Sequence, residues 1–375
     1  MKVLLMSITA GEGHNAAAKA IISALEANGH ECRFVDAYKE IDTRLYGIVS
    51  RGYLFSVSNM KRAYSGVYSH LEKRKRNSYR RSVTRLANRA LSGKIRKVID
   101  GFSPDAIVYT HCFCGVLLDV LREKEGLSPT VFGVLTDFVM HPYWEECLRT
   151  DYLVVAGETS VASAEKKGFH REQILPFGIP VREGFSEKTD KSAARRYLGL
   201  EEDMTTILLI GGSMGYGNIK KLAKSIDAVD LPLQLIAVCG NNARAYGELA
   251  TISFKKNVRI YAFTDKIALL MDAADAVVTK PGGLTASEAL AKRLPLFLTD
   301  GIPGIESRNA ELLLNNGVAI RISETYPIGT AIRELVRNPV RLAALSGCID
   351  CVRRPRSTET LCRFIERCVS EKKKS

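Results

Sequence analysis

Short hydrophobic runs alternate with amphipathic segments along the first half of the chain. The run KVLLMSI at residues 2–8 is followed at 14–28 by apolar residues at helical spacing. Four further apolar runs alternate with segments of helical pattern: RFVDAY, DAIVYT, TVFGVLT and YLVVAG. Such alternation is typical of parallel strands joined by crossover helices. The first half therefore predicts a doubly wound α/β domain.

A second series of the same kind begins near residue 190. Its apolar runs are TTILLIGG, LIAVCG, VRIYAF, DAVVTK, LPLFLTD and VAIRI. The stretch from Pro176 to Asp190 lacks periodicity and is rich in Pro, Gly and charge, which indicates a hinge. We therefore expect an N-terminal domain at 1–183, a C-terminal domain at 184–345, and a final helical segment at 346–375 that packs back across the domains.

Length and composition fit two soluble domains. The chain has 375 residues, too many for one ordinary core, with 46% apolar and 25% charged residues. No apolar run reaches the roughly 18 residues that a membrane-spanning helix needs. The first run enters a glycine turn instead of a cleavage site for a signal peptide, so we expect a cytoplasmic protein.

Positive charge is concentrated in one segment. Residues 61–97 contain thirteen Lys or Arg and one acid, Glu72, which gives +12 of the chain's net +13. Apolar and aromatic residues without acids precede it at 45–57. This pairing favours contact with an anionic membrane surface. A solvated helix face and a nucleic-acid site are the alternatives, but no nucleic-acid motif accompanies the charge, so we expect no nucleic-acid partner.

The sequence gives little support to a metal site. Cys348, Cys351, Cys362 and Cys368 have a spacing that zinc could use, but the last two lie on an apolar helical face and are explained by core packing. No D-x-D motif is present, and Asp272 and Asp275 are interpreted as surface acids three residues apart on a helix. We expect neither a metal nor a cofactor.

Three glycine-rich turns follow predicted strands, at 11–14, 211–215 and 281–285. Ligands bind at the carboxyl ends of strands in open α/β sheets, and glycines there let backbone N–H groups approach a phosphate. The first turn has a G-x-G-x-x-A pattern that, with Asp36, fits a nicotinamide cofactor, although His14 stands within it. Thr285 and Glu288 share a helix face, which fits either a diphosphate and ribose site or a capping box without a ligand.

Several motifs together resemble those of glycosyltransferase family 28. They are G-E-G-H with N-A-A-A-K-A-I, T-D-F with H-P-Y-W, G-I-P-V-R, G-G-S-M-G, and K-P-G-G-L-T-A-S-E-A-L followed by P-G-I-E-S-R-N. The chain is most similar to the branch of monogalactosyldiacylglycerol synthases and processive diacylglycerol glucosyltransferases, over nearly its whole length. The resemblance implies a GT-B fold, in which two Rossmann-like domains face each other across a cleft. It places a UDP-sugar mainly in the second domain and a lipid acceptor in the first.

The resemblance also assigns residues to each part of the donor. The ribose is held by Glu288, the diphosphate by Gly212, Ser213, Met214, Gly282, Gly283, Leu284 and Thr285, the nucleotide by Arg182 and the backbone of Phe263, and the sugar hydroxyls by Glu306 and Asn309, while Gly13 approaches the donor from the first domain.

Attack of an alcohol on an anomeric carbon needs a base and stabilisation of the departing diphosphate. By position alone His14 is a helix-end or solvent-exposed imidazole, but the resemblance makes it the catalytic base, with Asp137 assisting and His141 and Trp144 lining the acceptor site. The expected reaction is inverting, metal-independent transfer of glucose or galactose from UDP to the 3-hydroxyl of diacylglycerol. The enzyme is expected at the cytoplasmic face of the cell membrane, attached peripherally.

The sequence also leaves three alternative functions open. A polyprenyl-linked acceptor would keep the same chemistry with a different lipid. An NAD-dependent oxidoreductase would use Asp36 for a ribose hydroxyl, and a basic membrane-binding or RNA-binding protein would need no catalytic residue.

Overall fold

The structure is a computed structural model that describes residues 1–9, 12–42, 83–211 and 218–374. The chain divides into two compact units, each of which is described by itself. The N-terminal unit comprises Met1–Glu183, Ile302–Ile305 and Arg356–Ser375, and the C-terminal unit comprises Gly184–Gly301 and Glu306–Pro355.

The N-terminal unit is built on a parallel six-stranded sheet with the order β2-β1-β3-β4-β5-β6. The strands are β1 (Lys2–Ser7), β2 (Glu31–Asp36), β3 (Ala106–Tyr109), β4 (Thr130–Val134), β5 (Tyr152–Val154) and β6 (Ile174–Leu175). The central strands β3 and β4 are buried along their whole length, as expected where helices cover both faces.

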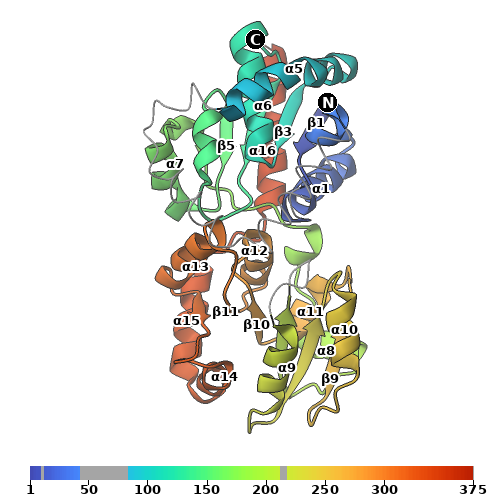
Figure 1. Ribbon diagram of the computed structural model, residues 1–375, viewed down its shortest axis with the longest axis vertical. Coiled ribbons are helices and arrows are strands. Elements are labelled where there is room, and N and C mark those ends of the chain that lie inside the picture. Colours follow the sequence, from blue (N-terminus) through green and yellow to red (C-terminus); the bar gives the residue numbers. More distant parts are fainter. Residues whose placement is uncertain (10–11, 43–82, 212–217, 375) are drawn as a thin grey trace. The chain divides into compact units, whose positions relative to one another are not determined.

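Helices and short 3₁₀ turns connect these strands. They are α1 (Glu12–Ala27), α2 (Ala37–Ile41), α5 (Val83–Phe102), α6 (Cys112–Glu125), η2 (Pro142–Glu146), η3 (Glu158–Ser160), α7 (Val161–Lys167) and η4 (Arg171–Gln173). The last helix, α16 (Ser357–Lys374), returns to this unit and packs beside α1 (Figure 1). Its residues Leu361, Cys362 and Ile365 are buried in the sheet core, which confirms the packing interpretation of Cys362.

The C-terminal unit repeats the design with the order β12-β11-β10-β7-β8-β9. Its strands are β7 (Thr205–Ile210), β8 (Leu233–Val238), β9 (Val258–Tyr261), β10 (Ala276–Thr279), β11 (Leu296–Leu298) and β12 (Ala319–Arg321). Its helices are α8 (Lys191–Leu198), α9 (Ile219–Asp227), α10 (Ala243–Ala250), α11 (Ile267–Ala273), α12 (Gly283–Ala291), α13 (Ile305–Asn315), α14 (Ile328–Arg337) and α15 (Pro339–Val352), with the short turn η5 (Glu183–Phe185) before them. The prediction of two doubly wound α/β domains is confirmed.

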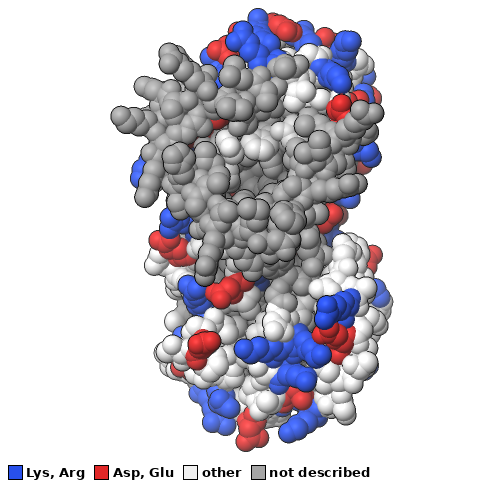
Figure 2. Space-filling view, in the orientation of Figure 1, with Lys and Arg blue, Asp and Glu red and all other residues white. Residues whose placement is uncertain are grey.

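Most of the basic segment 61–97 lies outside the described residues, so its predicted membrane contact stays a prediction. Over the parts that are drawn in colour in Figure 2, basic and acidic side chains are interspersed. Within the described ranges, none of the helices is both long enough and apolar enough to span a bilayer.

The interpretation of Asp272 and Asp275 as surface acids is wrong. Asp272 on α11 is 3% exposed and pairs with Lys292 at 2.8 Å. Asp275 lies beyond the end of α11 and accepts hydrogen bonds from Arg195 and from the backbone N–H of Thr206. Sequence spacing did not reveal these partners because each comes from a distant part of the chain.

Candidate active site

Three histidines line a pocket of about 220 Å³ in the N-terminal unit. His14 lies in the first turn of α1, directly after β1, and His111 follows β3. Asp137 and His141 follow β4, and Trp144 lies in η2. The pocket therefore lies where the carboxyl ends of β1, β3 and β4 meet, which is where parallel sheets usually hold ligands. The structure brings together four predicted residues: His14, Asp137, His141 and Trp144.

The half-buried imidazole of His14 is oriented through one of its nitrogens. Nδ1 lies 2.8 Å from the backbone oxygen of Thr110 and 2.8 Å from Oγ1 of Thr136. A carbonyl oxygen only accepts hydrogen bonds, so Nδ1 carries the proton and donates it to Thr110. The lone pair of the neutral ring is then on Nε2, and no hydrogen bond to Nε2 occurs among the described residues. This geometry makes Nε2 available as a base.

The electrostatic surroundings keep His14 neutral at pH 7. Burial lowers its pKa from the usual 6.5, while the nearby charge of Asp137 and the hydrogen bond to Thr110 partly oppose that effect. A general base must be unprotonated to act, and an acidic neighbour stabilises the imidazolium that forms when it takes a proton. Asp137 is therefore placed to assist His14 electrostatically.

The other two histidines serve as caps. Nδ1 of His111 accepts the backbone N–H of Phe113 at the start of α6, and Nδ1 of His141 accepts that of Tyr143 at the start of η2. Burial lowers the pKa of His111 well below its usual value and that of His141 to about 4. Both rings therefore remain neutral at physiological pH, and His14 differs from them in having an acidic neighbour that raises its pKa.

Sequence reasoning missed the residues that orient His14. Thr110 acts through its backbone, and Thr136 and His111 come from loops after other strands. The ring of His111 packs edge-on against that of His14 with centroids 4.7 Å apart. The only signal for these partners was that each follows a predicted strand, because the carboxyl ends of parallel strands gather at one edge.

The C-terminal unit presents the uncapped start of α12. Gly282 is the N-cap and makes no side-chain cap hydrogen bond, so the capping-box interpretation of Thr285 and Glu288 is wrong. Thr285 is the third residue of the helix, and Glu288, one turn further on, is buried. The first N–H groups of a helix and its positive dipole end together favour an anion.

Glu306 and Asn309 hold the loop that leads into α12. The carboxylate of Glu306 accepts a hydrogen bond from Lys280 at 2.5 Å, and Asn309 Nδ2 donates to the backbone oxygen of Pro281 at 3.1 Å. A Cβ atom at Gly301 would lie 2.7 Å from Oε2 of Glu306, so only glycine fits there. Lys280 was missed by the sequence reasoning. It places a cation at the carboxyl end of β10, beside the start of α12.

The remaining predicted donor residues are placed as follows. Arg182 is exposed, the Phe263 side chain is 67% exposed, and Gly13 is half-buried. Gly212, Ser213 and Met214 lie outside the described residues. Within the described ranges, no group of three or more His, Cys, Asp or Glu side chains is placed to hold a metal ion.

Both carboxylate oxygens of Asp36 accept hydrogen bonds from protein groups. Oδ2 accepts both the backbone N–H of Thr9 at 3.0 Å and its hydroxyl at 2.6 Å, while Oδ1 caps α2 through the N–H of Lys39. These bonds account for the carboxylate, so it does not need a cofactor ribose to explain its position.

Two parallel α/β units, each with polar residues at the carboxyl ends of its strands, form a GT-B fold. Solved structures with this fold align over nearly the whole chain. MurG of Acinetobacter baumannii has a TM-score of 0.64 at 14% identity, covering 98% of this chain and 99% of that one. HepE of Anabaena, solved with UDP-glucose, has a TM-score of 0.57 at 13% identity, covering 99% and 100%.

Sequence comparison gives the family. Residues 14–181 match the monogalactosyldiacylglycerol synthase family, and residues 206–348 match the C-terminal domain of glycosyltransferase family 28. A probable chloroplastic monogalactosyldiacylglycerol synthase of Glycine max is 31% identical, covering 91% of this chain and 68% of the relative. A processive diacylglycerol β-glucosyltransferase of Bacillus pumilus is 27% identical, covering 96% and 93%. The chain belongs to the monogalactosyldiacylglycerol synthase group of family 28 glycosyltransferases, and it is a glycosyltransferase.

Proposed function

We propose that this enzyme transfers glucose or galactose from a UDP-sugar to the 3-hydroxyl of diacylglycerol, with inversion at the anomeric carbon. Relatives at 31% and 27% identity carry the names of diacylglycerol glycosyltransferases. The single structural observation that carries the proposal is the orientation of His14. Its Nδ1 proton is committed to Thr110, which leaves Nε2 as the base in the pocket.

The reaction proceeds by a single displacement. The acceptor oxygen forms a bond to the anomeric carbon while the bond from that carbon to the diphosphate oxygen breaks, and that electron pair leaves with UDP. The acceptor proton passes to Nε2 of His14, and the carboxylate of Asp137 stabilises the resulting imidazolium. His141 and Trp144 line the same pocket and are proposed to contact the acceptor.

The C-terminal unit is proposed to hold the donor. The N–H groups at Gly283, Leu284 and Thr285 receive the diphosphate, and Glu288 receives the ribose. Lys280 adds a positive charge at the same loop, and charge-assisted hydrogen bonds are about twice as strong as neutral ones. These groups stabilise the charge that develops on the leaving diphosphate without a metal ion. Gly212, Ser213, Met214, Arg182 and the backbone at Phe263 remain assigned to the donor through the family resemblance, as do Glu306, Asn309 and Gly13.

The lipid acceptor requires the enzyme to work at a membrane. We propose that segment 61–97 binds an anionic bilayer at its cytoplasmic face, where each Lys or Arg near the headgroups contributes about 1 kcal/mol. This contact would keep the enzyme peripheral.

A direct assay tests the proposal. Purified enzyme is incubated with UDP-[14C]glucose or UDP-[14C]galactose and vesicles that contain diacylglycerol, and the lipid extract is separated by chromatography. The expected result is a labelled glycosyldiacylglycerol from at least one donor, with the label lost in His14→Ala. If neither donor labels diacylglycerol but a polyprenyl-linked acceptor becomes labelled, the acceptor assignment is wrong.

A second readout addresses the donor itself. UDP and the correct UDP-sugar are expected to raise the melting temperature, because a ligand that binds the folded state stabilises it. A melting temperature that rises with NAD(H) but not with UDP would instead support the oxidoreductase hypothesis.

A further inference from the structure

A second pocket, of about 420 Å³, lies in the C-terminal unit at the opposite end of its sheet from the start of α12. Thr205 is the first residue of β7, and Asp275 and Pro295 immediately precede β10 and β11. The start of α12 follows the carboxyl end of β10. A strand rises about 3.3 Å per residue, so the six residues of β7 separate the two edges by roughly 17 Å. This amino-end pocket is therefore distinct from the proposed donor site.

The amino-end pocket has an excess of positive charge. Five Lys or Arg and three Asp residues line it. Two ion pairs are structural: Arg195 with Asp275 at 2.7 Å, and the fully buried pair of Lys292 with Asp272 at 2.8 Å. Lys191 is a second cation that pairs with Asp275, with 2.5 Å between its Nζ and Oδ1 of Asp275, and the Lys191 side chain is 38% exposed.

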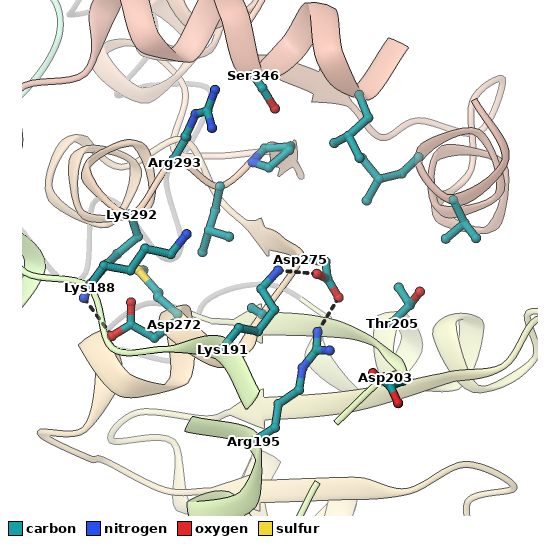
Figure 3. Close-up of a pocket in the computed structure, with 17 residues that line it drawn as sticks. Lys188, Lys191, Arg195, Asp203, Thr205, Asp272, Asp275, Lys292, Arg293 and Ser346 are labelled. Atoms are coloured by element: carbon teal, nitrogen blue, oxygen red, sulfur yellow. Dashed lines mark hydrogen bonds and ion pairs between the residues drawn. The ribbon is translucent and has the colours of Figure 1, made fainter. Parts of the chain in front are cut away.

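Two more cations face the same pocket. Lys188 is exposed and has no ion-pair partner among the described residues. Arg293 lies across the pocket from Lys191, next to Ser346 (Figure 3). Its backbone has a φ of 63°, in the left-handed region that glycine usually occupies at the end of a helix. Its guanidinium pairs with Asp350, a contact that is half-exposed and therefore readily exchanged for a stronger anion.

A buried acceptor atom adds a second chemical requirement. Oδ1 of Asp272 is buried and has no hydrogen-bond partner within the described part of the chain, although the same residue lines the pocket. A buried polar atom without a partner is costly, and a carboxylate oxygen needs a donor such as a hydroxyl. Thr205 and Ser346, which each carry a hydroxyl group, also line the pocket. A ligand that suits the site carries both a negative phosphate and hydroxyl groups.

We propose that the amino-end pocket binds the phosphate ester of a polyol, of which glycerol phosphate is the simplest, either free in solution or as a lipid headgroup. Lys188, Lys191 and Arg293 bind the phosphate, and Asp272 accepts a hydroxyl. The exposed apolar side chains of Val336 and Leu342 also line the pocket, so the chain of a bound lipid would contact them. Because this pocket and the proposed donor site lie at opposite ends of the strands, binding here does not depend on the proposed reaction.

Titration calorimetry of the full chain with sn-glycerol 3-phosphate tests the proposal. We expect saturable binding, with inorganic phosphate at least fivefold weaker because it cannot supply the carbon-bound hydroxyl. The double variant Lys188→Gln with Lys191→Gln is expected to weaken binding tenfold or more, and Arg195 still holds Asp275 in it. Lys224→Gln, an exposed change on α9 away from the pocket, is the matched control and should bind as the unmodified chain does.

Lys280→Met distinguishes the two proposed sites. Lys280 does not line the amino-end pocket, so this variant should bind glycerol phosphate normally whether or not the donor-site proposal is correct. Sedimentation with phosphatidylglycerol or phosphatidylcholine vesicles distinguishes the sources. Segment 61–97 is unchanged in the double variant and is proposed to bind anionic bilayers by itself, so the readout is the change in affinity. Weaker binding to phosphatidylglycerol in the double variant supports a lipid headgroup, and unchanged vesicle binding with lost glycerol phosphate binding supports a free ligand. The proposal is overturned if glycerol phosphate does not saturate, if the double variant binds it normally, or if inorganic phosphate binds equally well.

Discussion

Replacing His14 with alanine tests whether this residue is the general base of the proposed reaction. The structure commits Nδ1 to the backbone oxygen of Thr110, which leaves Nε2 as the proposed acceptor of the proton. A positioned general base contributes about 10²- to 10⁴-fold to a rate, which corresponds to roughly 2.7 to 5.4 kcal/mol at 1.36 kcal/mol per tenfold. We therefore expect kcat to fall by about that factor. KM for the UDP-sugar should change little, because most of the proposed donor contacts lie in the C-terminal unit.

The pH dependence provides an independent check. Burial lowers the pKa of His14 below 6.5, so kcat/KM should be constant from pH 7 to 8 and should fall only as the pH drops below 6.5 and the base becomes protonated. The charge of Asp137 raises that pKa, so Asp137→Asn should move the acid limb to lower pH. An acid limb that moves to higher pH would contradict this assignment.

The measurement is the initial rate of [14C]-hexose transfer to diacylglycerol in mixed micelles, at saturating acceptor, from pH 5 to 8. Thr136→Val is the matched control, because it removes a hydroxyl 2.8 Å from Nδ1 but leaves the bond to Thr110. Loss of one neutral hydrogen bond is worth about 1 kcal/mol, or roughly fivefold in rate. If His14→Ala keeps more than a tenth of the normal kcat, His14 is not the base.

Three further changes have outcomes that follow from the geometry. Lys280→Met should raise the dissociation constant for UDP about tenfold in calorimetry, and a change below twofold would remove this residue from the donor site. The pKa of His141 is about 4 in the folded chain and about 6.5 in the unfolded chain. Between pH 6.5 and pH 4 the unfolded chain therefore binds more protons than the folded chain. The unfolding free energy should fall by up to about 3 kcal/mol over that range. Urea titrations should show a weaker pH dependence in His141→Gln, and an equal dependence would refute the assignment. Gly133→Ala would place a Cβ 2.7 Å from Tyr109 Oη and should destabilise by about 1–3 kcal/mol in urea titrations; an unchanged midpoint would contradict it.

Much of the architecture was predictable because it depends on short-range patterns. The buried runs at 2–7 and 205–210 are strands, and each is followed by a helix whose apolar face covers the sheet. Such periodicity is visible in the sequence because each strand buries both faces. The capping-box alternative at α12 fails for a local reason: Thr285 fits an N-cap by type, but the helix already begins at Gly283.

The site was only partly predictable. The motifs predicted His14 and Asp137 as site residues, and both line the pocket. The sequence carries no signal that the backbone oxygen of Thr110 fixes the tautomer of His14 across 96 positions. The pairing of Lys280 with Glu306 likewise joins the loop after β10 to the first turn of α13, which meet only when both elements are in place. These contacts depend on strand order, which local spacing does not encode.

The sequence by itself determined the α/β class, the positions of most strands and the family, because hydrophobic periodicity and short motifs are local properties of the chain. Tertiary structure alone decided which nitrogen of His14 is free, that Asp36 is held by Thr9, and that Asp272 is buried with one unpartnered oxygen. The physical reason is that proton positions, desolvation and ion pairing depend on which distant groups fold to within about 3 Å of one another.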